Sequence, residues 1–271
     1  MKRRLSLMAA GAVVLTVTMG AQAGGTAPLL SHRPIVVIGA NQSINWSGYN
    51  QGSIEQGGKL FNSVSGSWTV PTARAHKAGE AEYSSTWVGI GGGCVDAGCT
   101  VGDTTLIQAG TEQDVDASGH ASYGAWWELI PAPSVTITEM QVKAGDRMLV
   151  TISENPAGSE IWTIAVKNLT NGQSFTQTVP YTSTHATAEW IVETPVVIDD
   201  NGNVSVGPLP KLSTVRIDKA TTNGANAALK PSEEIQLVDF NLKPLATPSA
   251  PDRQADGFDD CTYASTCAVP R

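Results

Sequence analysis

Short runs rich in Val, Ile, Thr, Trp and Tyr recur along this chain, and Gly, Pro, Asn and Ser separate them. After the N-terminal stretch, no long segment has the apolar period of an amphipathic helix. Regularly spaced strands with turn residues between them predict an all-β, antiparallel sandwich or jelly-roll-like barrel. The runs interpreted as strands are 59–70, 82–91, 104–115, 121–130, 135–142, 147–154, 161–168, 173–180, 188–194 and 213–220.

The organisation along the chain indicates a single domain. Residues 161–179 read as a β-hairpin, because an Asn-Gly dipeptide between two runs favours a tight turn. No internal repeat is convincing, and no linker is long enough to separate two domains. We therefore predict one β-sandwich domain over residues 45–243, preceded by a leader segment at 24–44. Residues 244–271 are interpreted as a C-terminal surface appendage with its own cysteine pair.

The first residues have the pattern of a secretory signal. Three basic residues at positions 2–4 precede an apolar stretch at 5–19, and an Ala-Gln-Ala sequence ends at Ala23. The apolar stretch is too short for a membrane anchor, and no second spanning segment follows. We expect residues 1–23 to be removed and the mature protein to be secreted, without a membrane partner.

The charge of the chain argues against some partners. Removing residues 1–23 takes away three basic and no acidic residues, so the formal charge moves from −8 to −11. Nucleic acids and anionic membranes bind positive surfaces, so neither is expected as a partner. Only 15% of the residues are charged. A chain with few ion pairs loses little stability when acid protonates its carboxylates, which favours tolerance of acid.

The cysteines are expected to form local disulfides. In an exported protein, closely spaced cysteines more often form bridges than remain free thiols. The four histidines are scattered, and none has the spacing from a cysteine pair that a zinc site requires. No metal or other cofactor is therefore expected. The predicted bridges join Cys94 to Cys99 and Cys261 to Cys267.

Common catalytic signatures are missing from the sequence. There is no G-x-S-x-G elbow, no H-E-x-x-H helix, no phosphate loop and no dinucleotide fingerprint. The sequence around Asp103 lacks the glycine of an aspartic-protease loop. Most of the seven tryptophans fall within or beside the predicted strands. The remaining candidates for chemistry are Glu and Gln side chains among these tryptophans.

Strand alternation assigns the polar candidates to faces. Trp126 and Glu128 share one face, and Trp127 and Leu129 share the other, which is the better candidate for the core. The first face then presents an indole beside a carboxylate, as in a cleft that binds an extended polymer. By the same alternation, Gln108 is expected to project onto a concave surface.

Two glutamates lie in one apolar strand. Glu189, Ile191 and Glu193 are expected on one face, with Trp190 and Val192 on the other. Four residues of strand separate the glutamates by roughly 13 Å, too far for both to act on one bond.

Seven short motifs follow one another along more than half of the chain: NWSGY (45–49), WTVP (68–71), WVGIGG (87–92), LIQAG (106–110), AWWELIP (125–131), KNLTNG (167–172) and AEWIVE (188–193). No single motif is specific, but the ordered set is. The set resembles that of the glutamic peptidases, or eqolisins, which are secreted endopeptidases that act in acid.

The resemblance implies a fold and a pair of catalytic residues. The fold is a concanavalin-like sandwich of two large, curved antiparallel sheets, whose concave face carries a Gln/Glu dyad. The family's catalytic Gln matches Gln108 and its catalytic Glu matches Glu189. Glu193 then becomes a rim or structural carboxylate. Glu189 is expected to activate water as a general base, and Gln108 to stabilise the oxyanion.

The resemblance also implies the surroundings of the dyad. Family tryptophans near the cleft match Trp46, Trp87 and Trp126, and a supporting glutamate matches Glu128. A protein or peptide is the expected substrate, no metal is needed, and the chain is expected to act as a monomer.

Two positions depart from the pattern of the family, and two alternative functions remain open. Gly91 and Gly124 stand where better-known fungal members have Asp, so the pH optimum is open. A glycoside hydrolase on a similar sandwich would use a carboxylate pair such as Glu128 and Glu189. A secreted binding module would use its tryptophans to stack on sugar or peptide, without turnover.

Overall fold

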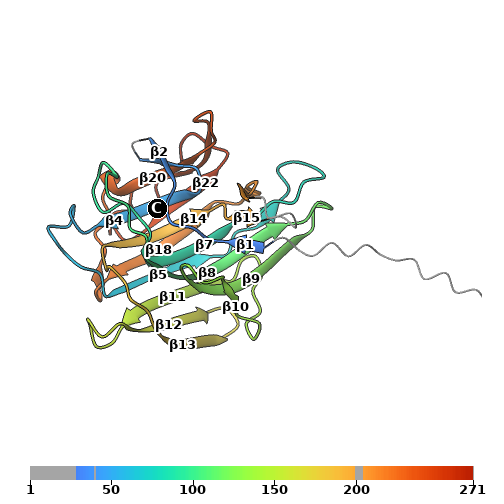
Figure 1. Cartoon of the computed structure of the whole chain (residues 1–271). Helices are drawn as coiled ribbons and strands as arrows, with labels where there is room; N and C mark the ends of the chain where they lie inside the picture. The colour runs from blue at the N-terminus through green and yellow to red at the C-terminus, as the bar shows by residue number, and fades with distance from the viewer. Residues whose placement is uncertain (1–28, 40, 199–203, 271) are drawn as a thin grey trace, which may run out of the picture.

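Two antiparallel sheets face each other across one core (Figure 1). The computed structural model describes residues 29–39, 41–198 and 204–270. The predicted signal at 1–23 lies outside this part of the chain. Within it, the secondary structure is β-strand apart from one short 3-10 helix, so the all-β prediction is confirmed. No helix in these described ranges is long and apolar enough to span a membrane.

The first sheet is called the cleft sheet. Its strands are antiparallel to their neighbours and differ in length from two to ten residues. In spatial order they are β4 (Trp46–Gly52), β14 (Thr187–Glu193), β7 (Ser85–Gly91), β8 (Leu106–Val115), β9 (Ala121–Leu129) and β10 (Val135–Thr136).

The second sheet is called the outer sheet. One of its members, β20 (Glu234–Val238), also pairs with β4 and so joins the two sheets along one side. The other members, in spatial order, are β13 (Ser174–Pro180), β12 (Ile161–Asn168), β11 (Arg147–Glu154), β5 (Ser63–Thr69), β18 (Val215–Thr222), β22 (Phe258–Thr262) and β21 (Pro244–Pro248).

Short elements complete the fold. β2 and β3 pair with each other, and β3 also runs parallel to β20. The bounds of the short elements are β1 (Leu29–Ser31), β2 (Val37–Gly39), β3 (Gln42–Ser43), β6 (Ala73–Arg74), β15 (Val196–Ile198), β16 (Val204–Val206), β17 (Lys211–Leu212), β19 (Ala225–Asn226) and η1 (Pro231–Glu233).

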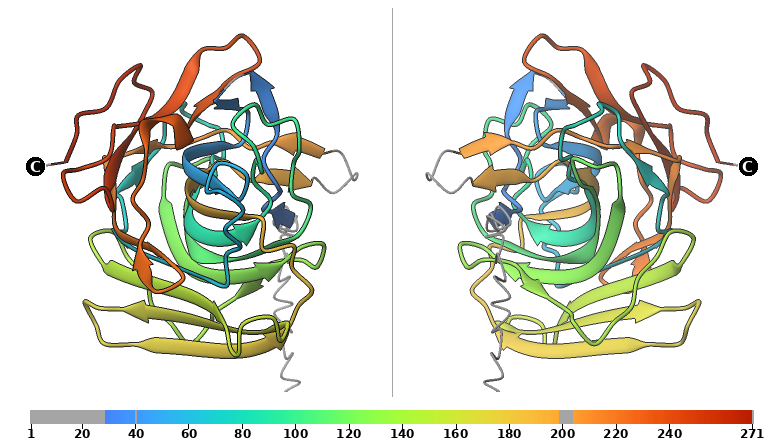
Figure 2. Two further views of the ribbon diagram at one scale, coloured as in Figure 1. Left: turned by 90° about the vertical axis from the view of Figure 1, so that its left-hand side faces the viewer. Right: turned by 90° about the vertical axis from the view of Figure 1, so that its right-hand side faces the viewer.

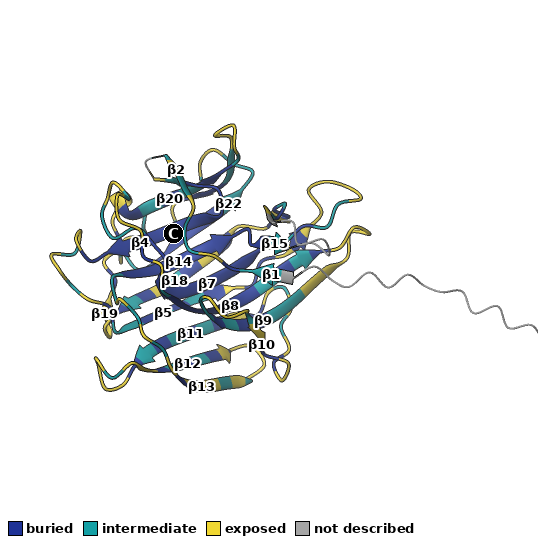
Figure 3. Ribbon diagram, viewed as in Figure 1, coloured by how far each residue is buried: buried dark blue, intermediate teal, exposed yellow. Residues whose placement is uncertain are grey.

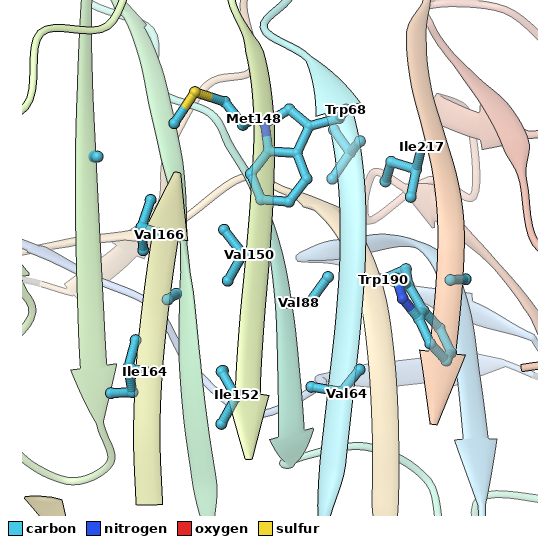
Figure 4. Packing of buried hydrophobic residues seen from close by; sticks show 14 of the residues in the cluster. Val64, Trp68, Val88, Met148, Val150, Ile152, Ile164, Val166, Trp190 and Ile217 are labelled. Carbon is cyan, nitrogen blue, oxygen red and sulfur yellow. The ribbon is translucent and has the colours of Figure 1, made fainter. Parts of the chain in front are cut away.

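The core fills the space between the two sheets (Figure 4). In β11, buried residues alternate with more exposed ones, because side chains of a strand point to opposite faces in turn. Met148, Val150 and Ile152 are the buried members, and they face Val88 of the cleft sheet. Trp127 and Leu129 pack against this same core, as predicted.

Strands β4, β14 and β7 of the cleft sheet are buried on both faces (Figure 3). In β14, Trp190 and Val192 belong to the core between the sheets. Ile191 belongs to a second apolar cluster on the opposite face, which is called the cleft face. The predicted separation of the two faces of β14 is therefore confirmed.

Most of the predicted strands form. The hairpin of β12 and β13 is confirmed, with Gly172 at a positive φ of 79° in its turn. The prediction for 135–142 is wrong, because only Val135–Thr136 is a strand there. Ile137 and Met140 are buried in the connection that follows, so the apolar residues of this segment come from a packed loop. Strand β4 was not among the runs predicted.

The interpretation of residues 244–271 as an appendage is wrong for its first part. β21 and β22 are members of the outer sheet, and β22 pairs with β18. Phe258 is fully buried in the core. The Pro and Asp content suggested a solvated tail, but the strand pairing and the buried aromatic ring make this segment part of the sandwich.

The segment predicted as a leader is built into the fold where the structure describes it. β1 pairs with β15, and β3 pairs with β20. Between β1 and β2 the chain crosses β7 and β14 (Figure 1). Figure 2 shows this crossing on the side toward which the cleft sheet curves. The segment therefore covers the cleft face.

Candidate active site

Residues from five neighbouring strands form a polar row across the cleft face, called the dyad row. Strand register places Asn50, Glu189, Gly89, Gln108 and Glu128 directly beside one another in that order. Only a glycine separates the two predicted catalytic residues. Their strands are two intervals of about 4.8 Å apart, and the side chains of Trp87 and Leu106 pack over the glycine between them.

Gln108 is held by Glu128. The amide Nε2 donates a hydrogen bond of 2.8 Å to Oε2 of the carboxylate, and both side chains are fully buried. Oε1 of Gln108 has no partner among the residues that the structure describes. Burial raises the pKa of Glu128 to about 7, although the positive charge of His32 and the bond from Gln108 act in the opposite direction. The amide is thus fixed at one end and free at the other.

Glu189 lies at the other side of the row without a partner. It is fully buried, and neither carboxylate oxygen has a hydrogen-bond partner in the described part of the chain. Burial raises its pKa well above the ordinary value, and the hydroxyl of Thr187 only partly offsets this. Buried polar groups are normally satisfied. A carboxylate left free in this way is suited to act on a water or a substrate.

The loop that follows β7 encloses Glu189. Asn50 donates to the carbonyl oxygen of Cys94 at 2.8 Å and accepts from its backbone N–H at 2.9 Å. The predicted disulfide between Cys94 and Cys99 is confirmed and closes this loop. A Cβ on Gly93 would lie 2.7 Å from Glu189 Oε1, so the backbone comes close to the carboxylate. The disulfide therefore shapes the wall of the site.

The second predicted disulfide lies elsewhere. Cys261, in β22, is bonded to Cys267, so this prediction is confirmed as well. Within the described residues, one group of three carboxylates could share an ion, and it comprises Asp218, Asp252 and Asp256 at the outer sheet. It is not part of the dyad row.

An apolar row lies beside the dyad row. Register places Ile191, Trp87, Gly110 and Trp126 next to one another. Trp87 meets Trp46 edge to face, with ring centroids 4.9 Å apart. These residues form the second apolar cluster with Leu106 and Ile235. The structure thus brings the three predicted cleft tryptophans together.

A third row holds Glu193, and it is not at a rim. Glu193 is fully buried, and its Oε2 accepts hydrogen bonds of 2.8 Å from Trp87 Nε1. The same oxygen lies 2.8 Å from His32 Nδ1. Sequence reasoning missed His32, because a single histidine in a presumed leader carries no signal. Only the folded chain brings it to the sheet.

Gly124 and Gly91 have different surroundings. Gly124 lies beside Glu112 in the third row, and a Cβ added there would be 2.5 Å from Glu112 Oε1. Glu112 thus supplies a carboxylate next to the position where the fungal sequences have Asp, and burial raises its pKa. At Gly91, with φ of 94°, a Cβ would lie 2.0 Å from Thr105 O. The backbone there leaves no room for a side chain.

Comparisons with known proteins agree with this geometry. A family model described as the Peptidase A4 family matches residues 44–252. Aspergillopepsin-2 of Aspergillus niger is 27% identical over an alignment of 197 residues, and the match covers 65% of this chain. The chain spans 64% of the length of this curated relative.

Two solved structures share the fold. Scytalido-glutamic peptidase, with a transition state analog inhibitor, has a TM-score of 0.59 and 19% identity, covering 80% of this chain and 98% of that one. Aspergilloglutamic peptidase from Aspergillus niger has a TM-score of 0.51 and 25% identity, covering 67% of this chain and 99% of that one. The predicted sandwich of large antiparallel sheets is therefore confirmed.

Proposed function

The chain belongs to the Peptidase A4 family, and we propose that it is a secreted endopeptidase that hydrolyses peptide bonds with Glu189 and Gln108. One observation carries the proposal. Both residues lie in one buried row with only Gly89 between them, and each has unpartnered oxygen atoms there. A complete dyad row in one chain supports action as a monomer on a protein or peptide.

In the proposed reaction, the ionised carboxylate of Glu189 takes a proton from a water while that water attacks the scissile carbonyl carbon. Gln108 donates its second amide hydrogen to the oxyanion that forms, because the first is bonded to Glu128. When the C–N bond breaks, Glu189 returns the proton to the departing nitrogen. Two products result, a carboxylic acid and an amine.

The proposed mechanism operates in acid. The reaction needs the ionised form of Glu189, whose pKa burial raises; entry of water and substrate would reduce that burial and favour the carboxylate in mildly acidic medium. Glu128, with a pKa of about 7, is neutral there. As the pH rises through about 7, Glu128 becomes negative beside the developing oxyanion and opposes its formation. Activity is therefore expected to fall toward neutral pH.

The alternatives receive less support. Three strand intervals, roughly 14 Å, separate the backbones of Glu128 and Glu189, while inverting glycosidases hold their carboxyl groups about 6.5–9.5 Å apart. Glu128 is also engaged by Gln108. A pure binding module would have no use for an unpartnered buried carboxylate.

The test is digestion of a denatured protein from acid to neutral pH, with new amino termini counted. The wild type should be active in acid, and Glu189→Gln should lose activity while circular dichroism stays unchanged. Glu139→Gln alters an exposed carboxylate and is the matched control. Hydrolysis that survives Glu189→Gln would contradict the proposal. N-terminal sequencing of protein from the culture medium tests cleavage after Ala23.

A further inference from the structure

The chain's own N-terminal segment lies across the cleft face. The backbone N–H of Ile35 donates to the carbonyl oxygen of Gly92, just beyond β7, at 2.9 Å. The Ile35 side chain packs against the apolar row. Three residues earlier, His32 reaches Glu193 at the other end of the same face. The residues between them stay near the Glu193 end of the face: the backbone N–H of Arg33 donates to Glu193 Oε1 at 3.3 Å, and Asn45 Nδ2 donates to the carbonyl oxygens of Arg33 and Pro34 at 3.3 and 3.2 Å.

His32 fills a defined slot. Its ring stacks on Trp126, with centroids 3.7 Å apart and planes 5° from parallel. Nδ1 lies 2.8 Å from Glu193 Oε2 and 3.3 Å from Ser85 Oγ. The side chain is only 2% exposed. Trp87 donates to the same oxygen of Glu193 and so fixes the carboxylate at the end of the slot.

The charges around the slot favour a cation. Carboxylates from three strands face His32, namely Glu193 from β14, Glu128 from β9 and Glu112 from β8. Burial lowers the pKa of His32, but the charge and the hydrogen bond of Glu193 outweigh it, so the pKa is raised. The face of Trp126 adds a cation–π attraction. A flat, positively charged ring can stack on Trp126, bond to Glu193 and be attracted by the other two carboxylates.

We propose that Trp126, Trp87, Ser85 and Glu193 form a substrate subsite for a histidine side chain, and that His32 occupies it as an internal ligand that keeps substrates out. This inference rests on the proposed peptidase function. Glu193 lies four residues along β14 from Glu189, roughly 13 Å in a strand. The subsite would therefore bind the side chain of a residue about three to four positions from the scissile bond of an extended peptide.

Cleavage-site profiling tests the selectivity. The comparison is made in His32→Ala, whose subsite is empty, with and without Glu193→Gln; both are incubated in acid with a peptide mixture, and the cut sites are identified by mass spectrometry. His32→Ala should enrich histidine at one fixed position relative to the cut. Adding Glu193→Gln should abolish this enrichment, and adding Glu139→Gln should not. Absence of enrichment in His32→Ala, or its persistence when Glu193→Gln is added, would overturn the inference.

The effect of removing the His32 side chain from the subsite is measured as a change in the rate of peptide hydrolysis. His32→Ala in the full chain should raise the initial rate on a short peptide about tenfold or more, the size expected for loss of a hydrogen bond to a charged group. His120 is exposed, so His120→Ala is the matched control and should change nothing. An unchanged rate in His32→Ala, with an unchanged fold, would count against blockage by this segment.

A binding measurement separates failure of the inference from failure of the proposed function. In a His32→Ala, Glu189→Gln double variant, a free peptide with the sequence of residues 30–38 is titrated while tryptophan fluorescence is followed. A second peptide carries Ala in place of the histidine. Tighter binding of the first peptide by about tenfold supports the subsite even if no substrate is cleaved. Equal binding of the two peptides would refute it.

Discussion

Gln108 Nε2 donates a hydrogen bond of 2.8 Å to Glu128 Oε2, its partner in register on β9. This bond determines which way the amide points, because the amide nitrogen can only donate and a carboxyl oxygen of Glu128 can accept. The Oε1 atom has no partner among the described residues and, as an acceptor, could orient an attacking water. In the proposed mechanism Glu128 acts through Gln108 and is a positioning residue.

Glu128→Gln should change the pH profile more than the reaction. The substituted amide can still accept from Gln108, but it cannot become negative as the pH rises through about 7. We expect activity near pH 7 to fall less steeply in the variant than in the wild type. The measurement is kcat/KM from acid to pH 8 for both proteins. If the two pH profiles superimpose, ionisation of Glu128 does not cause the loss of activity near pH 7.

Gln108→Ala should reduce kcat by about 100- to 1,000-fold, the usual effect of losing one oxyanion donor, with a smaller change in KM. Gln108→Glu preserves size but places a carboxylate next to the oxyanion, so it should be at least as damaging. Steady-state kinetics on one peptide substrate distinguish the two parameters. A large rise in KM at constant kcat would assign Gln108 to substrate binding instead.

Gly89→Ala should impair the site by displacing the side chains that pack over this glycine in the dyad row. The added Cβ would lie 2.9 Å from Trp87 Cζ3 and 3.0 Å from Leu106 Cδ1, so these side chains must shift. We expect loss of most activity and a lowered melting temperature. Gly102→Ala adds the same methyl group where nothing lies within 4 Å, and it should leave both quantities unchanged.

Stability should decrease as the pH rises through about 7. Burial raises the pKa of Asp260 and Asp114 to about 7. Because the native state then binds more protons than the unfolded state, this contribution is complete below the ordinary pKa near 4 and is lost as the pH passes the native value. The melting temperature should be higher at pH 5 than at pH 8.

Asp260→Asn tests this contribution at one residue. Oδ2 of Asp260 accepts a 2.6 Å hydrogen bond from Ser47, which an amide oxygen can also accept. The variant resembles the protonated acid, so its melting temperature should fall less between pH 5 and pH 8. An equal fall in variant and wild type would assign the pH dependence to other groups.

Phe258→Ala should destabilise the protein by about 3–5 kcal/mol, because it empties a fully buried site between the sheets. Urea unfolding followed by tryptophan fluorescence provides the measurement. Phe240 is 77% exposed, so Phe240→Ala serves as the control and should change stability little. Equal, small effects would mean that β22 does not contribute to the core.

The strand pattern was readable from the sequence because alternation is local. Residues 147–154 and 161–168 were predicted as strands, and both form strands whose buried residues alternate with more exposed ones. The two faces of β14 and the packing of Trp127 followed in the same way. The ordered motifs pointed to Gln108 and Glu189 through their resemblance to those of the glutamic peptidases.

The sequence by itself therefore determined the fold class and the local disulfides, and it led to the proposal that Gln108 and Glu189 form a dyad. Only the tertiary structure decided what surrounds it. Register across five strands put Gly89 between the dyad residues and Glu112 beside Gly124. The segment from β1 to β2 returned to the cleft face and paired His32 with Glu193, 161 residues away. Such contacts depend on the curvature of the sheet and the path of distant segments, which no local pattern encodes.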